Sequence, residues 1–181
     1  MKTYIILLRG VTPGGKNKVA MVRLREVLTG AGFDNVRTYI TSGNALVDTG
    51  LSAREVAKTV HDQIQKHLGP DLAVVVRTGA QLQEVLDENP FQQGYDRSRV
   101  FFVMFAQLPA PEKVKDLSAR DYGEEKLAFT KNTDAASLYI PGPYGRSRLT
   151  AAFLEKKLGV SSTMRNFNTM SRLVEMSRSE T

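Results

Sequence analysis

The order of predicted strands and helices in residues 4–78 is compatible with few folds. The residue patterns predict a strand, a helix, two strands, a second helix and a last strand. Tyr4–Leu8 is an unbroken apolar run that ends at Arg9-Gly10, which predicts a strand buried on both faces. A short turn, Ser42-Gly43-Asn44, separates the third and fourth patterns and predicts a hairpin. The order βαββαβ is that of the ferredoxin-like unit.

The two helices of this half have recognisable ends. Apolar residues from Met21 to Ala31 recur at helical spacing, with Asn17 as the expected N-cap and Gly32 as the stop. Ser52-Ala-Arg-Glu55 has the form of a capping box, and the helix that it opens ends at Gly69-Pro70.

The second half of the chain repeats the same order of elements, beginning at the apolar strand Val100–Ala106. We therefore expect an α+β fold of two ferredoxin-like halves packed together, with a linking helix and a C-terminal helix. The expected parts are an N-terminal half over residues 1–78, a linking helix and loop over 79–98, and a C-terminal half with the terminal helix over 99–181.

The composition of the chain excludes several kinds of functional site. The chain has no cysteine, which excludes disulfides and thiolate catalysis, and its only two histidines, His61 and His67, are six residues apart, too far to share a metal on one helix face. We expect no metal and no cofactor. With no apolar leader at its start and only short apolar stretches, the chain is expected to be cytoplasmic and not bound to membrane. The net charge of +6 favours an anionic partner or a basic solvated surface.

The segment from Arg9 to Lys18 joins the first strand to the first helix and has the composition of an anion cradle. Its small residues let several backbone N–H groups point at one spot, and a helix start would add partial positive charge. The residues expected to act here are Arg9, Gly14, Gly15, Lys16 and Asn17. A purely structural glycine turn is the alternative.

This segment also differs by one residue from the phosphate-loop pattern of nucleotide hydrolases, because Asn17 stands where that pattern needs Ser or Thr. The missing hydroxyl would bind Mg²⁺, and no strand ends in the aspartate that holds the metal in such enzymes. Phosphoryl transfer therefore remains the weaker alternative.

Two further motifs carry polar groups. Tyr39, Ser42 and Asn44 surround the hairpin turn, although Ser-Gly-Asn also satisfies the backbone of a tight turn by itself. Arg165, Asn166 and Thr169 precede or open the last helix, where such side chains are caps or, with the arginine, hold an oxyanion. The strand at Val100–Ala106 lacks the glycine and basic residue of an RNA-binding strand, so we expect it to be core.

The three motifs together resemble the bacterial domain-of-unknown-function family sixteen ninety-seven, in the order Arg9–Asn17, Thr38–Asn44 and Thr163–Thr169. Four positions depart from that family's common residues, namely Thr12, Pro13, Thr41 and Phe167. The family has no established activity, so the resemblance implies only that the three motifs serve one site.

The sequence thus predicts a binding module for a phosphate-bearing small molecule or nucleic acid, with no catalytic set. An assembly protein is a further alternative, and the oligomeric state stays open. We expect Lys16 and Arg165 to lie within side-chain reach of each other. The predicted ligand-binding residues are Arg9, Gly14, Gly15, Lys16, Asn17, Tyr39, Ser42, Asn44, Arg165, Asn166 and Thr169.

Overall fold

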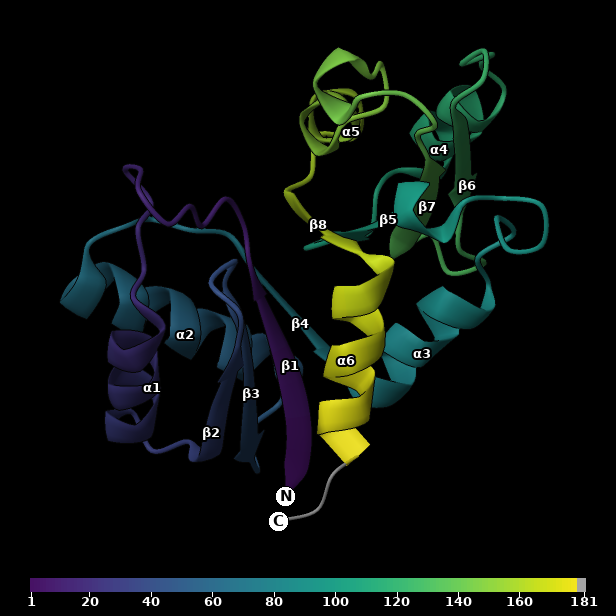
Figure 1. Ribbon diagram of the computed structural model, residues 1–181. Coiled ribbons are helices and arrows are strands. Elements are labelled where there is room, and N and C mark those ends of the chain that lie inside the picture. Colours follow the sequence, from purple (N-terminus) through teal and green to yellow (C-terminus); the bar gives the residue numbers. More distant parts are fainter. Residues whose placement is uncertain (179–181) are drawn as a thin grey trace. The chain divides into compact units, whose positions relative to one another are not determined.

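A computed structural model describes residues 1–178 and shows two four-stranded antiparallel sheets, each flanked by helices (Figure 1). By contacts the chain divides into two compact units. Unit 1 comprises Met1–Gln81 with the C-terminal segment from Leu173, and unit 2 comprises Leu82–Arg172. The mixed α+β class and the two ferredoxin-like halves predicted from the sequence are confirmed.

Unit 1 contains the first sheet, whose strand order is β2-β3-β1-β4. Two helices cover one of its faces over a core that includes Ile6, Leu24 and Val60. The elements are β1 (Lys2–Leu8), α1 (Met21–Gly30), β2 (Asp34–Tyr39), β3 (Asn44–Thr49), α2 (Ala53–Leu68) and β4 (Val74–Thr78). The predicted capping box at Ser52 is present, since its hydroxyl accepts from the Glu55 N–H while the Glu55 carboxylate accepts from the Ser52 N–H.

Unit 2 repeats this topology with the strand order β6-β7-β5-β8. Its helices and sheet share a core that includes Val103, Leu138 and Leu154. The elements are β5 (Val100–Phe105), α4 (Pro111–Ser118), β6 (Lys126–Phe129), β7 (Ala135–Tyr139), α5 (Ala151–Leu158) and β8 (Ser162–Asn166), with short 3-10 turns at Arg97–Arg99 and Tyr144–Arg146.

Two helices contribute residues to both units. The linking helix α3 (Gly79–Asp87) and the C-terminal helix α6 (Phe167–Arg178) were both expected from the sequence. Within unit 1, the end of α6 is held by Arg37 of β2, whose Nη1 donates to the Met176 carbonyl at 2.7 Å.

The face of each sheet that is not covered by the flanking helix pair is also buried. On the first sheet Ile5, Leu7 and Leu46 are fully buried, and on the second sheet so are Phe102 and Met104. The strand β5 is therefore core, as expected, and neither sheet offers the open face on which RNA-binding ferredoxin-like domains stack bases.

Candidate ligand-binding site

The segment over residues 9–18, which we call the basic loop, leaves the sheet at the end of β1. The Arg9 N–H donates to the Ala73 carbonyl at 3.1 Å, and Gly10 then turns the chain with a φ of 69°. Later in the loop, the Lys18 N–H closes a turn onto the Gly15 carbonyl at 3.2 Å.

The prediction that Asn17 caps α1 is wrong. The helix begins at Met21, its N-cap is Ala20, and no side chain caps it. Val19 is buried in the core, and Ala20 between it and the helix is extended. The positive end of α1 therefore lies beyond the turn and is not built from the N–H groups of Gly14–Asn17.

Positive charge in the basic loop comes from exposed side chains. Arg9, Lys16 and Lys18 are all exposed. Within residues 1–178, neither Lys16 nor Lys18 forms an ion pair, so both ammonium groups are available to a ligand.

The two loop glycines differ in their surroundings. A Cβ added at Gly15 would lie 2.5 Å from Thr12 Oγ1, whereas one added at Gly14 would meet nothing within 4 Å. A side chain at Gly15 would therefore require the exposed Thr12 side chain to move. Gly14 is not needed for packing, and its exposed backbone is accessible to a ligand.

The second predicted motif forms a turn between β2 and β3 that side-chain hydrogen bonds hold together, and we call it the clamped turn (residues 39–44). Asn44 belongs to β3 and is fully buried, and its amide donates to the Tyr39 carbonyl at 3.1 Å and to Ser42 Oγ at 3.0 Å. These bonds give Asn44 and Ser42 a structural role within the turn. Tyr39 is half-buried, and Ile40 lies at the exposed tip with a φ of 48°.

The basic loop and the clamped turn meet at Gly43. The Leu8 N–H donates to the Gly43 carbonyl at 2.9 Å. Gly43 has a φ of 88°, and a Cβ placed there would lie 2.9 Å from both Leu8 Cβ and Val11 Cγ2. Two of the three predicted motifs, which are distant in sequence, therefore lie side by side in unit 1.

The third motif lies in unit 2. Asn166 Oδ1 accepts from the Thr169 N–H at 2.9 Å, so Asn166 caps α6 as the sequence indicated. Arg165 is 8% exposed on β8, and its Nη1 donates to Thr163 Oγ1 and to the Met164 carbonyl. Burial lowers the pKa of Arg165 to about 10. The expected approach of Lys16 to Arg165 stays a prediction.

Arg97, which no sequence motif includes, stacks on the third motif. Its guanidinium carbon lies 4.4 Å from the centre of the Phe167 ring. Together with Ser98, Asn166 and Asn168, these two residues line a pocket of about 250 Å³. No pattern in the sequence points to this contact, because Arg97 stands in a polar loop distant from the motif in the chain.

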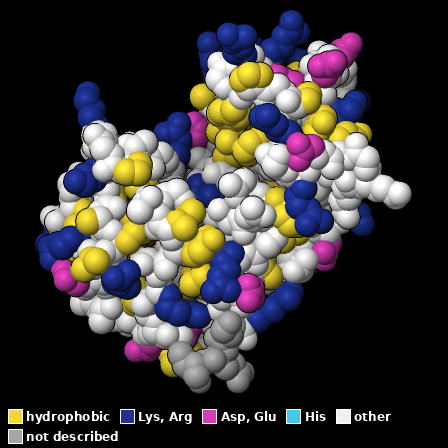
Figure 2. All heavy atoms as spheres, viewed as in Figure 1, with side chains coloured by type: hydrophobic (Ala, Val, Ile, Leu, Met, Phe, Trp, Pro, Cys, Tyr) yellow, Lys and Arg dark blue, Asp and Glu magenta, His cyan; other side chains and the backbone are white. Residues whose placement is uncertain are grey.

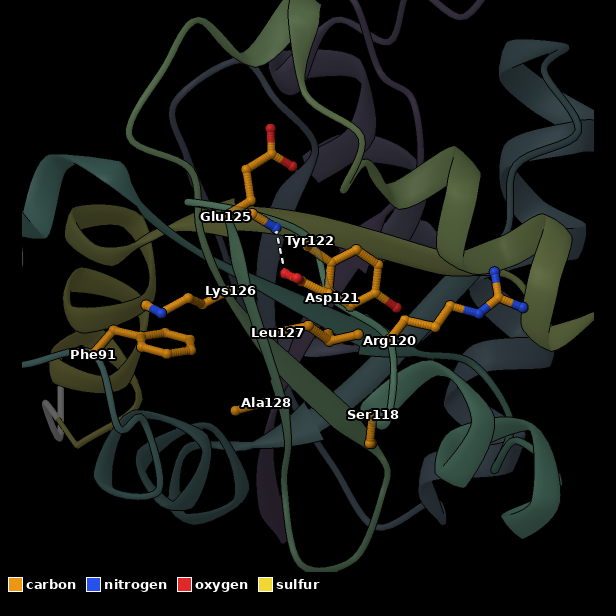
Figure 3. Close-up of a pocket in the computed structure, with 10 residues that line it drawn as sticks. Phe91, Ser118, Arg120, Asp121, Tyr122, Glu125, Lys126, Leu127 and Ala128 are labelled. Atoms are coloured by element: carbon orange, nitrogen blue, oxygen red, sulfur yellow. Dashed lines mark hydrogen bonds between the residues drawn. The ribbon is translucent and has the colours of Figure 1, made fainter.

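Another pocket, of about 290 Å³, follows strand β6 in unit 2 (Figure 3). Phe91 and Lys126 lie on one side of the strand, and Arg120 and Tyr122 lie on the other. The two carboxylates that line the pocket accept hydrogen bonds from backbone N–H groups. The Gly123 N–H donates to Asp121 Oδ1 at 2.8 Å, and the Leu149 N–H donates to Glu125 Oε2 at 3.0 Å. None of the predicted site residues lines this pocket.

Asp48 lies on β3 at the end away from the clamped turn, opposite Thr3 of β1, and its carboxylate has structural partners. Burial by itself raises the pKa of Asp48, but hydrogen bonds from Thr3 Oγ1 and Asn35 Nδ2, with Arg37 nearby, outweigh it and hold that pKa below its ordinary value.

Within residues 1–178 there is no group of three or more His, Asp or Glu side chains placed to hold a metal ion. No helix in that range has the length and apolar character needed to cross a membrane.

Basic side chains are spread widely over the face of the molecule shown in Figure 2. The net charge of +6 therefore does not by itself locate a site. The candidate site is located instead by the local contacts of the basic loop and the clamped turn.

These observations define an α+β protein built from two ferredoxin-like halves, with a glycine-rich basic loop packed on a hairpin turn. The chain belongs to the family described as "Protein of unknown function (DUF1697)", whose sequence model matches residues 1–133. The first two motifs lie inside the matched range, and the third lies outside it.

A solved structure has the same fold. The chain is similar to "conserved bacterial protein SP0830 from Streptococcus pneumoniae", with a TM-score of 0.76 and 22% sequence identity. The likeness covers 97% of this chain and 98% of the other. No curated protein matches the chain.

Proposed function

We propose that this protein is a binding module for a phosphate-bearing ligand, a nucleotide or a nucleic acid, held at the basic loop beside the clamped turn. One observation carries the proposal: the Leu8–Gly43 hydrogen bond and the packing of Gly43 against Val11 bring an exposed cationic loop against the clamped turn. The hydrogen bonds within the clamped turn would limit the conformational entropy that is lost on binding.

The proposed contacts follow from the chemistry of the exposed groups. Lys16 and Lys18, with Arg9, would attract phosphate oxygens by charge, and the exposed backbone at Gly14 would offer N–H donors. Tyr39 would supply an aromatic ring beside them. The α1 helix dipole has no part in the proposal, because α1 begins only at Met21.

Nucleotide binding by the purified protein tests the proposal. We expect adenosine monophosphate, or a short single-stranded oligonucleotide, to bind in calorimetry, and Lys16→Ala to weaken binding by about tenfold through loss of a charged hydrogen bond. Lys66→Ala is the matched control, since Lys66 is also exposed in unit 1 and its loss changes the net charge equally. Absence of binding by any phosphate compound, or equal affinity in the two variants, would contradict the proposal.

A Gly14→Ala variant separates backbone contacts from side-chain charge. The added methyl group meets no protein atom within 4 Å, so the melting temperature should not change. If backbone N–H groups at this point hold phosphate, the methyl group obstructs the ligand and affinity falls. Gly142→Ala, which also meets nothing within 4 Å, should leave both quantities unchanged.

The structure weakens the phosphoryl-transfer alternative. Nucleotide hydrolases with a phosphate loop start a helix directly at the loop and use a parallel sheet, whereas the sheet of unit 1 is antiparallel and α1 starts four residues after Asn17. The decisive measurement is nucleotide turnover with Mg²⁺, for which we expect no difference between the native protein and Lys16→Ala.

A further inference from the structure

Ile40, at the tip of the clamped turn, is unusual both in its backbone conformation and in the exposure of its side chain. Its φ of 48° lies in the left-handed region, which a β-branched residue rarely adopts. Its apolar side chain is also 49% exposed. Asn or Gly would satisfy the same backbone at lower conformational cost.

Contacts of the neighbouring residues hold the turn in which Ile40 lies. The buried amide of Asn44 holds the Tyr39 carbonyl on one side and Ser42 Oγ on the other. Gly43 is packed against Leu8 and Val11, so the turn has no room to relax in that direction. A strained residue kept in place by its neighbours is typical of sites where the side chain serves a ligand.

Other residues with positive φ in the described chain have a local explanation. Asn35, with a φ of 47°, is of a type that tolerates the left-handed region, and its amide donates to Asp48. Thr133 occupies the equivalent hairpin turn of unit 2 with a φ of 55°, but its side chain is half-buried and its N–H donates to the Thr130 carbonyl. Among the non-glycine residues of residues 1–178 with positive φ, Ile40 alone presents an exposed apolar side chain.

We infer that Ile40 contacts the base of the ligand beside Tyr39, and that the ligand is a phosphate ester carrying a planar base. This inference rests on the proposed function and makes it more specific. Cations of the basic loop would attract inorganic phosphate as well as a nucleotide, but an exposed isoleucine next to the half-buried Tyr39 stabilises only a ligand with apolar surface. The same base contact applies to a free nucleotide and to a nucleotide within a single strand.

The test compares adenosine monophosphate, ribose phosphate and inorganic phosphate on the native protein and on Ile40→Asn. The substitution removes the apolar side chain and favours the existing backbone, so the melting temperature should stay equal or rise. Adenosine monophosphate should bind about tenfold more weakly, from the apolar area that is no longer covered. Ribose phosphate and inorganic phosphate should bind as before. A single-stranded deoxyadenosine oligomer, measured in parallel, should show the same loss.

Two further variants control for turn geometry. Ile40→Leu keeps the apolar contact and should keep the affinity for adenosine monophosphate. Thr133→Asn relieves the equivalent backbone strain in unit 2 and should not change ligand affinity.

Comparing Lys16→Ala with Ile40→Asn distinguishes failure of the proposed function from failure of the role given to Ile40. Weaker binding in Lys16→Ala together with unchanged binding in Ile40→Asn would overturn the role of Ile40 and leave the proposed function standing. Unchanged binding in both variants would overturn the proposed function as well.

Discussion

Gly43 is the residue through which the two segments of the candidate site contact each other. Its φ of 88° and the two atoms at 2.9 Å from an added Cβ leave no place for a side chain. We expect Gly43→Ala to lower the free energy of unfolding by about 2–4 kcal/mol, from left-handed strain and overpacking combined. Urea denaturation measures this.

Gly30→Ala is the control for that variant. Gly30 is in α1, its φ is not positive, and an added Cβ meets nothing within 4 Å. The alanine should stabilise the protein by about 0.5–1 kcal/mol through helix propensity. Equal effects of the two substitutions would contradict the packing argument at Gly43.

His61 should titrate above its ordinary pKa of 6.5 because carboxylates meet both of its ring nitrogens. Asp62 lies 3.1 Å from Nδ1, and Asp71 lies 2.6 Å from Nε2. A raised pKa in the folded protein adds stability below pH 6.5, and this contribution is lost as the pH rises through the folded value. Asp71→Asn should therefore lower the pKa of His61 in an NMR titration, and its destabilising effect should be larger at acidic pH than at pH above the folded pKa.

At the scale of elements, the end of α6 depends on Arg37. The guanidinium donates to the Met176 carbonyl in the last turn of the helix, where positive charge is favoured. Arg37→Leu should lower the free energy of unfolding by about 1–2 kcal/mol through loss of this bond. Amides in the last turn of α6 should also exchange faster with solvent.

Arg54→Leu is the comparison for Arg37→Leu. Arg54 is exposed in the first turn of α2, and its side chain makes no hydrogen bond among the described residues. Its substitution should change stability by less than about 0.5 kcal/mol. A similar loss in both variants would mean that Arg37 acts through net charge only.

Helix starts show why local sequence patterns succeed in one place and fail in another. Ser52 and Glu55 satisfy each other's backbone groups across one turn, so four residues are enough to predict the start of α2. Asn17 is as suitable a cap by type, but Val19 is buried in the core, Ala20 is extended, and α1 starts only at Met21. The competing contact is tertiary, and no local pattern reveals it.

At the scale of the whole molecule, both faces of each sheet are closed, so a nucleic acid would contact loops rather than a sheet face. If the basic loop contacts about three phosphates, through Arg9, Lys16 and Lys18, the logarithm of oligonucleotide affinity should fall with the logarithm of salt concentration with a slope of about −2. A mononucleotide should give a clearly shallower slope. Equal slopes for the two ligands would show that only one phosphate is bound, and would favour a free nucleotide.

By itself the sequence determined the order of elements, the α+β class and the two ferredoxin-like halves, because apolar periodicity and turn residues act over a few neighbouring positions. It also pointed to Arg9–Lys18 and to the turn near Ser42 through their glycines and charges. It could not rank their residues by exposure, which depends on neighbours far along the chain.

Only the tertiary structure decided that Asn44 is fully buried within the turn, that Arg165 is 8% exposed, and that Arg97 stacks on Phe167. It also gave Ile40 its importance, since neither a left-handed φ nor an exposed side chain can be read from residue type. Gly43 shows both kinds of information. The sequence predicts that it lies in a turn, but its role in holding the basic loop depends on the close approach of Leu8 and Val11, which only the structure shows.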